Sequence, residues 1–372
     1  MKLGHLLSIL PFAAAIPQKA PSAFAGRVVF TPPSNYTDPR VLYARTAQLA
    51  NGDILATWEN YSPEPPPVWF PIYRSSDGGY TWKEISRVQD QVQKWGLRYQ
   101  PFLYVLPEPL GDFPAGTVLI SGSSIPTDLS KTQIELYASR DSGVTWQFVS
   151  HIAAGGRAVP NNGLTPVWEP FLMYYQKTLI CYYSDQRDNA THGQKMVHQT
   201  TADLKTWGKV IDDVAYPKYT DRPGMPTVAL LPNGKYIMAY EYGGGPAIGS
   251  SYQFPVYYKI VSNPEMFGPA TGVSLKATDG TIPTGSPYIV WSSVGGANGT
   301  LIVSSGSQGE IFVNTGLGQG AWKKIATQEG VSYTRHLRVL QDQTKLLIMG
   351  GGHLPPSTTN KVTVTVMDIS RL

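Results

Sequence analysis

Two glutamates stand among apolar and aromatic residues, where a carboxylate must either be paired with another polar group or have a function. Glu169 lies in the segment 167–172, and Glu241 lies between two tyrosines just before a run of three glycines. Leaving such a carboxylate desolvated and unpaired is costly. Two carboxylates in different environments can divide the hydrolysis of a glycosidic bond, because one stays ionised as a nucleophile and the other stays protonated as an acid. Glu169 and Glu241 are therefore the candidate catalytic residues.

Glu59 is a rival for the role of Glu241. Each of the two follows the start of an Asn-Gly turn, at Asn51 and Asn233, by eight positions. The glycine run beside Glu241 favours that residue, because bare backbone lets a substrate approach closely. This reasoning does not assign the roles of acid and nucleophile to the two carboxylates. The plainer interpretation of Glu169 is a solvated glutamate at the end of a strand.

Aromatic and basic residues near these carboxylates are candidates for sugar binding. Aromatic rings can stack on sugar rings, although most Trp and Tyr residues of a strand-rich chain belong to the core. Arginines can bind sugar hydroxyls or pair with the glutamates, although surface charge is the plainer role for any single arginine. The candidate substrate-binding residues are Arg45, Trp58, Glu59, Trp168, Tyr242, Tyr288 and Arg335.

A short turn motif recurs along the chain and indicates the elements that carry these residues. Ser75–Trp82 and Ser139–Trp146 both fit Ser-x-Asp-x-Gly-x-Thr-Trp, and Thr201–Trp207 is a looser copy without the glycine. The motif resembles the Asp-box of sialidase-like β-propellers, where Asp and Ser side chains close a hairpin turn and Gly takes a positive φ. We expect these turns to be structural and not catalytic.

The spacing of the repeats predicts the architecture. Trp82, Trp146 and Trp207 are separated by 64 and 61 residues, and a polar turn followed by an apolar strand recurs six times. Short strands repeated at this period predict an all-β chain that forms a single six-bladed β-propeller with Asp-box turns over residues 26–372. Strands expected at 26–30 and 361–367 would share the closing blade and remove two free edges.

Residues 1–20 are predicted to be a secretory signal peptide and short tail. One lysine precedes an apolar stretch and small residues suited to cleavage, with the cut expected between Ala15 and Ala25. A disordered tail is the alternative interpretation. The stretch is too short to span a bilayer, so we expect a secreted, extracellular protein with no membrane partner. Four Asn-x-Ser/Thr sequons suit a secreted glycoprotein, at Asn35, Asn60, Asn189 and Asn298.

Composition argues against several other classes of function. The net charge of +4 is small for 372 residues and forms no basic run, so no nucleic-acid partner is expected. The six histidines have no paired spacing of the kind that metal ligands show, and no phosphate-binding glycine loop occurs. We therefore expect neither a metal nor another cofactor.

Three segments together resemble the fungal exo-α-1,5-L-arabinanases of glycoside hydrolase family 93. They are Trp168–Pro170, Ala239–Gly245 and Ala56–Tyr61, and the resemblance extends over essentially the whole mature chain. It implies a retaining enzyme that releases arabinobiose from the non-reducing end of linear arabinan. It also implies that Glu169 is the nucleophile and Glu241 the acid/base. We expect a monomer.

Two other functions are compatible with a propeller of this kind. A sialidase would use three arginines to bind a carboxylate, and Arg45, Arg222 and Arg335 could fill those places. However, Arg45 is followed by Thr and Ala here, where sialidases usually show Arg-Ile-Pro, and their nucleophile is a tyrosine. A non-catalytic propeller that binds glycans in its central cleft is the second alternative, and it predicts that the carboxyls of Glu169 and Glu241 lie far apart.

Overall fold

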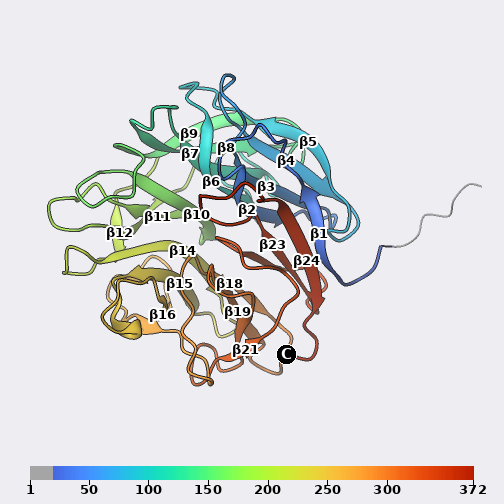
Figure 1. Cartoon of the computed structure of the whole chain (residues 1–372), viewed down its shortest axis with the longest axis vertical. Helices are drawn as coiled ribbons and strands as arrows, with labels where there is room; N and C mark the ends of the chain where they lie inside the picture. Colours follow the sequence, from blue (N-terminus) through green and yellow to red (C-terminus); the bar gives the residue numbers. More distant parts are fainter. Residues whose placement is uncertain (1–19) are drawn as a thin grey trace, which may run out of the picture.

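The computed structural model describes residues 20–372, and their strands form six four-stranded antiparallel sheets arranged as blades around an axis (Figure 1). The predicted six-bladed β-propeller is thus confirmed. The predicted signal peptide falls almost entirely outside the described residues, so secretion stays a prediction. No helix among residues 20–372 is long and apolar enough to cross a membrane.

The innermost strands of the six blades contact one another around the axis; they are β2, β6, β10, β14, β18 and β22. Each blade then adds three strands outward. Blade I holds β2 (Val41–Gln48), β3 (Ile54–Asn60), β4 (Phe70–Ser75) and β5 (Lys83–Val88). Blade II holds β6 (Leu97–Val105), β7 (Val118–Ser124), β8 (Thr132–Ser139) and β9 (Gln147–Gly155). Blade III holds β10 (Val167–Tyr175), β11 (Thr178–Asp185), β12 (Lys195–Thr201) and β13 (Ile211–Val214).

The second half of the ring follows the same order. Blade IV holds β14 (Arg222–Leu230), β15 (Tyr236–Gly243), β16 (Val256–Val261) and β17 (Val273–Ser274), with a short 3-10 helix η1 (Pro246–Ile248) after β15. Blade V holds β18 (Tyr288–Ser292), β19 (Thr300–Ser304), β20 (Ile311–Asn314) and β21 (Lys323–Ile325). Blade VI holds β22 (His336–Val339), β23 (Lys345–Gly350), β24 (Val362–Asp368) and β1 (Phe24–Phe30).

The two ends of the chain close the ring together, as predicted. β1 pairs antiparallel with β24, with Phe30 opposite Val362 and Val28 opposite Thr363. Phe30 also stacks on Trp58 of blade I, with 5.3 Å between ring centroids. This pairing covers the edge of β24 that would otherwise be free to pair with another chain.

The Asp-boxes tie off the turns between the third and fourth strands of blades I to III. In blade II, Asp141 accepts hydrogen bonds from the Thr145 N–H at 2.8 Å and the Thr145 hydroxyl at 2.6 Å. In the looser copy, Leu204 takes the place of the glycine with a φ of 66°. The Trp207 indole N–H donates to Ser150 Oγ of blade II at 3.0 Å, so the box also fastens its blade to the preceding one.

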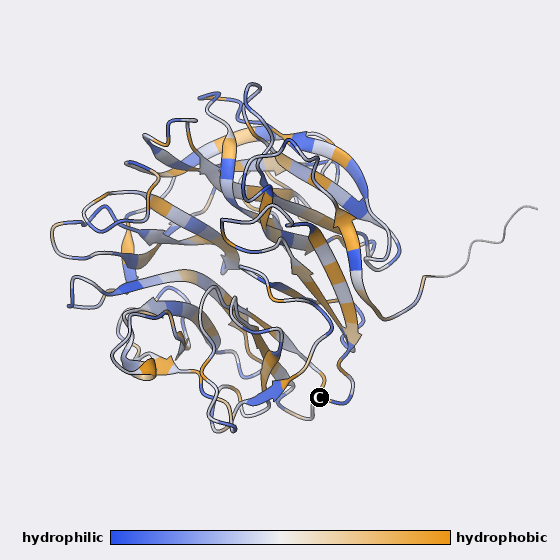
Figure 2. Cartoon of the chain, viewed as in Figure 1, coloured by the Kyte–Doolittle hydropathy of each residue, from blue (hydrophilic) through white to orange (hydrophobic). Residues whose placement is uncertain are grey.

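The core lies within and between the blades. Figure 2 shows hydrophobic residues concentrated on the strands, whereas the peripheral loops are more polar. This distribution holds the blades rigid, and the site is built on the ends of strands that face the axis.

One residue at the start of each inner strand, or just before it, adopts a left-handed backbone. These six residues have φ values between 38° and 63°; they are Tyr43, Gln100, Glu169, Met225, Ser286 and Thr334. The pairing with the second strand shifts register at this point in blades I to IV. A left-handed non-glycine residue carries strain, and repeated strain around one axis marks a functional region.

Candidate active site

Three glutamates gather at the end of the channel where the inner strands begin. Glu169 is the left-handed residue of β10 itself. Glu241 in β15 lies opposite Gly224 at the start of β14, and Glu59 in β3 lies opposite Leu42 at the start of β2. Gln100 links Glu59 to Glu169, because its N–H donates to Glu59 Oε1 and its side chain accepts from the Glu169 N–H. Gly224, the cross-strand partner of Glu241, lies beside Glu169 Oε2, so the three glutamates are neighbours at this end of the ring.

Glu169 is held by donors that favour its ionised form. Its Oε2 accepts hydrogen bonds from the Ser184 hydroxyl at 2.7 Å and from the Met225 N–H at 2.9 Å. Burial raises the pKa of this carboxyl, while the two donors and the positive charges of Arg222 and Arg45 act in the opposite direction. Within residues 20–372 no hydrogen bond reaches Oε1, so one oxygen of a partly exposed carboxylate remains available.

Glu241 has the complementary environment. Its Oε2 accepts a single hydrogen bond, from the Ser286 N–H at 2.7 Å. Burial raises the pKa of this carboxyl to about 8, with the charge of Glu169 as the second cause. Glu241 is therefore protonated at neutral pH, and no side chain or backbone group of residues 20–372 donates a hydrogen bond to Oε1.

Glu59 differs from the other two because the protein already occupies both of its oxygens. The Tyr61 hydroxyl donates to Oε2 at 2.7 Å, and the Gln100 N–H donates to Oε1 at 2.8 Å. The residue is only 3% exposed. Burial raises the pKa of its carboxyl to about 7. Glu59 thus lies beside Glu169 and Glu241 without a free oxygen to offer a ligand.

Gly224 keeps the space between Glu169 and Glu241 open. A Cβ atom at this position would lie 2.6 Å from Gln194 Nε2 and 3.4 Å from Glu169 Oε2. Because Gly224 is the cross-strand partner of Glu241, a side chain here would stand between the two carboxylates. A larger residue would therefore have to displace the Gln194 amide, which binds the Pro223 carbonyl oxygen.

Tyr333 is a site residue that the sequence reasoning missed. Burial raises the pKa of its hydroxyl well above the usual value, and the charges of Glu169, Glu241 and Glu59 add to the effect. Its hydroxyl lies 3.5 Å from Met225 Sδ. The register of the repeats could have found it, because Tyr333 precedes the left-handed Thr334 as Trp168 precedes Glu169.

Arg45 lies beneath the carboxylates and not at an open surface. Its guanidinium stacks over the Tyr43 ring at 4.1 Å and the Tyr288 ring at 5.1 Å. Its Nη1 donates to the carbonyl oxygens of Ala44 and Thr334. The residue is 3% exposed, so it contributes a buried positive charge, which partly offsets the rise that burial causes in the pKa of Glu59 and Glu169.

Two predicted substrate-binding residues lie away from the site. Trp58 is fully buried against Phe30 and Tyr73 near the closing blade. Arg335 is also fully buried and donates to the carbonyl oxygens of Gln308 and Glu310. Trp58 packs against other aromatic rings, and Arg335 forms hydrogen bonds inside the protein. Because neither side chain is exposed, the prediction that these two residues contact a sugar is corrected.

Trp168 and Tyr242, the chain neighbours of Glu169 and Glu241, are both fixed by contacts with other protein groups. The Trp168 indole N–H donates to Gln186 Oε1 at 2.9 Å. Tyr242 stacks on Tyr216 with 3.9 Å between ring centroids, and its hydroxyl donates to Asp221 Oδ2 at 2.6 Å. Both side chains are buried, so neither presents an open face on which a sugar could stack in this structure.

The glycine run after Glu241 has a packing role that differs from the one expected. A Cβ atom at Gly243 would lie 2.6 Å from the Phe254 ring, and one at Gly245 would lie 2.8 Å from the Tyr242 ring. The missing side chains therefore let aromatic residues pack against the backbone. The free oxygen of Glu241, and not the glycines, distinguishes it from Glu59.

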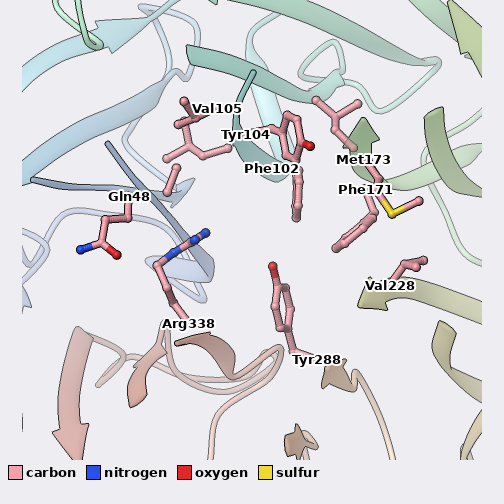
Figure 3. Close-up of a pocket in the computed structure, with 12 residues that line it drawn as sticks. Gln48, Phe102, Tyr104, Val105, Phe171, Met173, Val228, Tyr288 and Arg338 are labelled. Atoms are coloured by element: carbon pink, nitrogen blue, oxygen red, sulfur yellow. The ribbon is translucent and has the colours of Figure 1, made fainter. Parts of the chain in front are cut away.

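Tyr288 lines a separate cavity of about 290 Å³ further along the inner strands. Figure 3 shows Tyr288, Phe102 and Phe171 pointing into this space from three blades, with Arg338 beside it. Phe102 and Phe171 follow Gln100 and Glu169 by two positions, so the cavity lies deeper in the channel than the carboxylates. Among residues 20–372 no cluster of three or more His, Cys, Asp or Glu side chains could hold a metal ion.

The geometry brings together an ionisable carboxylate with two donors and a protonated carboxyl, each with one free oxygen. Solved structures with high similarity to this chain then show its family. The α-L-arabinanase of Penicillium chrysogenum, solved with arabinobiose, is 59% identical over 95% of this chain and 100% of its own, with a TM-score of 0.93. The GH93 α-L-arabinofuranosidase of Fusarium graminearum, also solved with arabinobiose, is 58% identical over 95% and 99%, with a TM-score of 0.93. The chain belongs to glycoside hydrolase family 93.

Membership of family 93 makes this chain a glycoside hydrolase and confirms the family resemblance seen in the sequence. The NanB sialidase of Streptococcus pneumoniae is 11% identical over 96% of this chain and 72% of its own, with a TM-score of 0.61, which shows a shared fold alone. No protein-family model matches the chain, and no curated protein matches it. Arg335 is one of the three arginines that a sialidase would need in order to bind the carboxylate of its substrate, and here it is fully buried.

Proposed function

We propose that this family 93 chain is a retaining exo-α-1,5-L-arabinanase that releases arabinobiose from the non-reducing end of linear arabinan. The observation that carries the proposal is the pair of glutamates at the axis, each with one oxygen free of protein donors. The two relatives solved with arabinobiose support the choice of substrate. We also propose that the chain is a secreted monomer.

In the first step Glu241 donates its proton to the glycosidic oxygen while Glu169 Oε1 attacks the anomeric carbon. The bond to the leaving sugar breaks, and an ester between Glu169 and the sugar forms. Glu169 suits attack because the Ser184 hydroxyl and the Met225 N–H stabilise its charge on Oε2. Glu241 suits proton donation because burial and the neighbouring charge keep it protonated.

In the second step Glu241 acts as a base instead of an acid. Formation of the ester removes the charge of Glu169, which is one of the causes that raise the pKa of Glu241. The pKa of Glu241 therefore falls, and its carboxylate can take a proton from water as the water attacks the anomeric carbon. The ester breaks, Glu169 recovers its charge, and Glu241 recovers its proton.

Product identification tests the proposal. The purified protein is incubated with linear arabinan and, in parallel, with a sialoside, and the released sugars are identified by chromatography and mass spectrometry. We expect arabinobiose from arabinan and nothing from the sialoside. Free sialic acid would overturn the proposal, and so would the absence of any sugar released from arabinan by folded protein.

A further inference from the structure

A chain of hydrogen bonds passes from blade to blade through the left-handed residues at the axis. The Gln100 N–H donates to Glu59 Oε1 at 2.8 Å, and the Glu169 N–H donates to Gln100 Oε1 at 3.1 Å. The Met225 N–H then donates to Glu169 Oε2 at 2.9 Å. Each backbone N–H thus donates to a side chain of the preceding blade. In the third of these hydrogen bonds the acceptor is Glu169, the proposed nucleophile.

The opposite half of the ring repeats this arrangement. There the Ser286 N–H donates to Glu241 Oε2 at 2.7 Å, and the Thr334 N–H donates to Ser286 Oγ at 3.0 Å. Glu59 and Glu241 occupy the same position in the second strands of blades I and IV, and each starts one series of bonds. In one series the starting glutamate keeps a free oxygen, whereas in the other Tyr61 covers it.

Gln100 and Glu59 leave the nucleophile little freedom. Gln100 is buried. Its backbone N–H donates to Glu59, and its side-chain oxygen accepts from the Glu169 N–H. The left-handed φ of 63° at Glu169 is strained for a residue with a side chain, so its N–H needs a fixed acceptor to hold that conformation. The carbonyl of the Gln100 side chain is that acceptor.

We propose that Glu59 and Gln100 are positioning residues that hold the backbone of Glu169 in the orientation for attack, with Glu59 acting through Gln100. The inference rests on the proposed function, because Glu169 is taken as the nucleophile. Glu59 acts here as a hydrogen-bond acceptor and not as a third acid, since both of its oxygens are already bound.

The experiment measures arabinobiose release by Glu59→Leu, Gln100→Leu and Glu59→Gln. The two leucine variants remove an acceptor and should lower kcat by roughly 10- to 100-fold with little change in KM, because a misplaced nucleophile slows the chemical step. Glu59→Gln keeps an oxygen that can accept the Gln100 N–H, and it should stay within about threefold of the wild type. The double variant Glu59→Leu/Gln100→Leu should be no slower than the slower single variant, because both changes break one series of bonds.

Glu135 provides a matched control. It is also fully buried, its Oε2 accepts a hydrogen bond from the hydroxyl of Tyr137 two residues later, and burial raises the pKa of its carboxyl to about 7. It lies in β8, the third strand of blade II, away from the axis. Glu135→Gln should leave kcat unchanged, and thermal melts report whether each variant folds.

The outcomes separate this proposal from the proposed function. Wild-type protein that releases no arabinobiose would defeat the proposed function, whatever the variants do. Active wild type with unchanged kcat in folded Gln100→Leu would defeat the positioning role, and so would a loss in Glu59→Gln as large as that in Glu59→Leu. If Glu59→Leu does not fold, Gln100→Leu and Glu59→Gln still decide between these results.

Discussion

The three glutamates at the axis differ in how far the protein satisfies their oxygens. Glu59 is bound at both oxygens, whereas Glu169 and Glu241 each keep one oxygen without a donor from residues 20–372. Neither of these two oxygens is among the buried polar atoms that lack a partner, so solvent or a ligand can reach both. The donors and charges around each carboxyl are the basis on which we propose Glu169 as the nucleophile and Glu241 as the acid.

The first prediction at this scale concerns the removal of either carboxyl that we propose to be catalytic. Glu169→Ala and Glu241→Ala should each lower the turnover of arabinan by roughly a thousandfold or more while the melting temperature changes little. Azide can replace the missing carboxylate, and it should form a glycosyl azide of inverted configuration with Glu169→Ala and of retained configuration with Glu241→Ala. Full activity in either folded variant would contradict the assignment.

The pH dependence of kcat/KM is the second prediction. Glu241 must be protonated to donate, and its pKa is raised to about 8, so activity should fall as the pH rises through about 8. Glu169 must be ionised to attack, and burial raises the pKa of its carboxyl above the usual range, so activity should also fall on the acid side. A rate that stays constant from pH 7 to pH 10 would argue against Glu241 as the acid.

At the scale of the element, the Asp-boxes were readable from the sequence because their chemistry is local. Asp141 and Thr145 lie within one turn, and the bonds between them depend on no distant residue. The left-handed bulges of the inner strands were not predicted, because the acceptor for each N–H comes from another blade. Gln100, Glu169 and Ser286 each stand directly before a proline in the sequence, and all three are left-handed.

The stability of an Asp-box is the prediction at this scale. Asp141→Ala removes three hydrogen bonds to Val144 and Thr145 and should lower the free energy of unfolding by about 1–2 kcal/mol, measured by chemical denaturation. Asp112→Ala is the control, because Asp112 pairs only with the exposed Lys205 and should change stability by less than about 0.5 kcal/mol. Equal effects of the two changes would show that the box contributes no more than a surface ion pair. Arabinan hydrolysis should survive both changes.

At the scale of the whole molecule, the ring depends on closure by β1. Phe30 joins blade VI to blade I through its contact with Trp58, so Phe30→Ala should lower the free energy of unfolding by about 1–3 kcal/mol. Val28→Ala in the same strand is the control, because the Val28 side chain is 53% exposed and should matter little. Unfolding followed by calorimetry measures both. A Phe30→Ala variant as stable as Val28→Ala would mean that the closing contact adds nothing.

The sequence predicted the six blades, which the structure confirms, and it singled out the two glutamates proposed here as catalytic, but it did not find the whole site. Tyr333 went unnoticed because its neighbours in the chain are polar, and its place beside the glutamates depends on the closure of the ring. Trp58 and Arg335 were wrongly placed at the sugar site because residue type alone does not distinguish a packed side chain from an exposed one. Such errors are expected wherever burial is decided by contacts between blades.

The configuration of the first product tests the central claim most directly. Proton NMR during the hydrolysis of linear arabinan shows which anomer of arabinobiose appears before mutarotation. A double displacement by Glu169 and Glu241 predicts that arabinobiose appears first as the α anomer, the configuration of the bond that was cut. Initial release of the β anomer would contradict the account, because it would mean a single displacement by water with no covalent bond to Glu169.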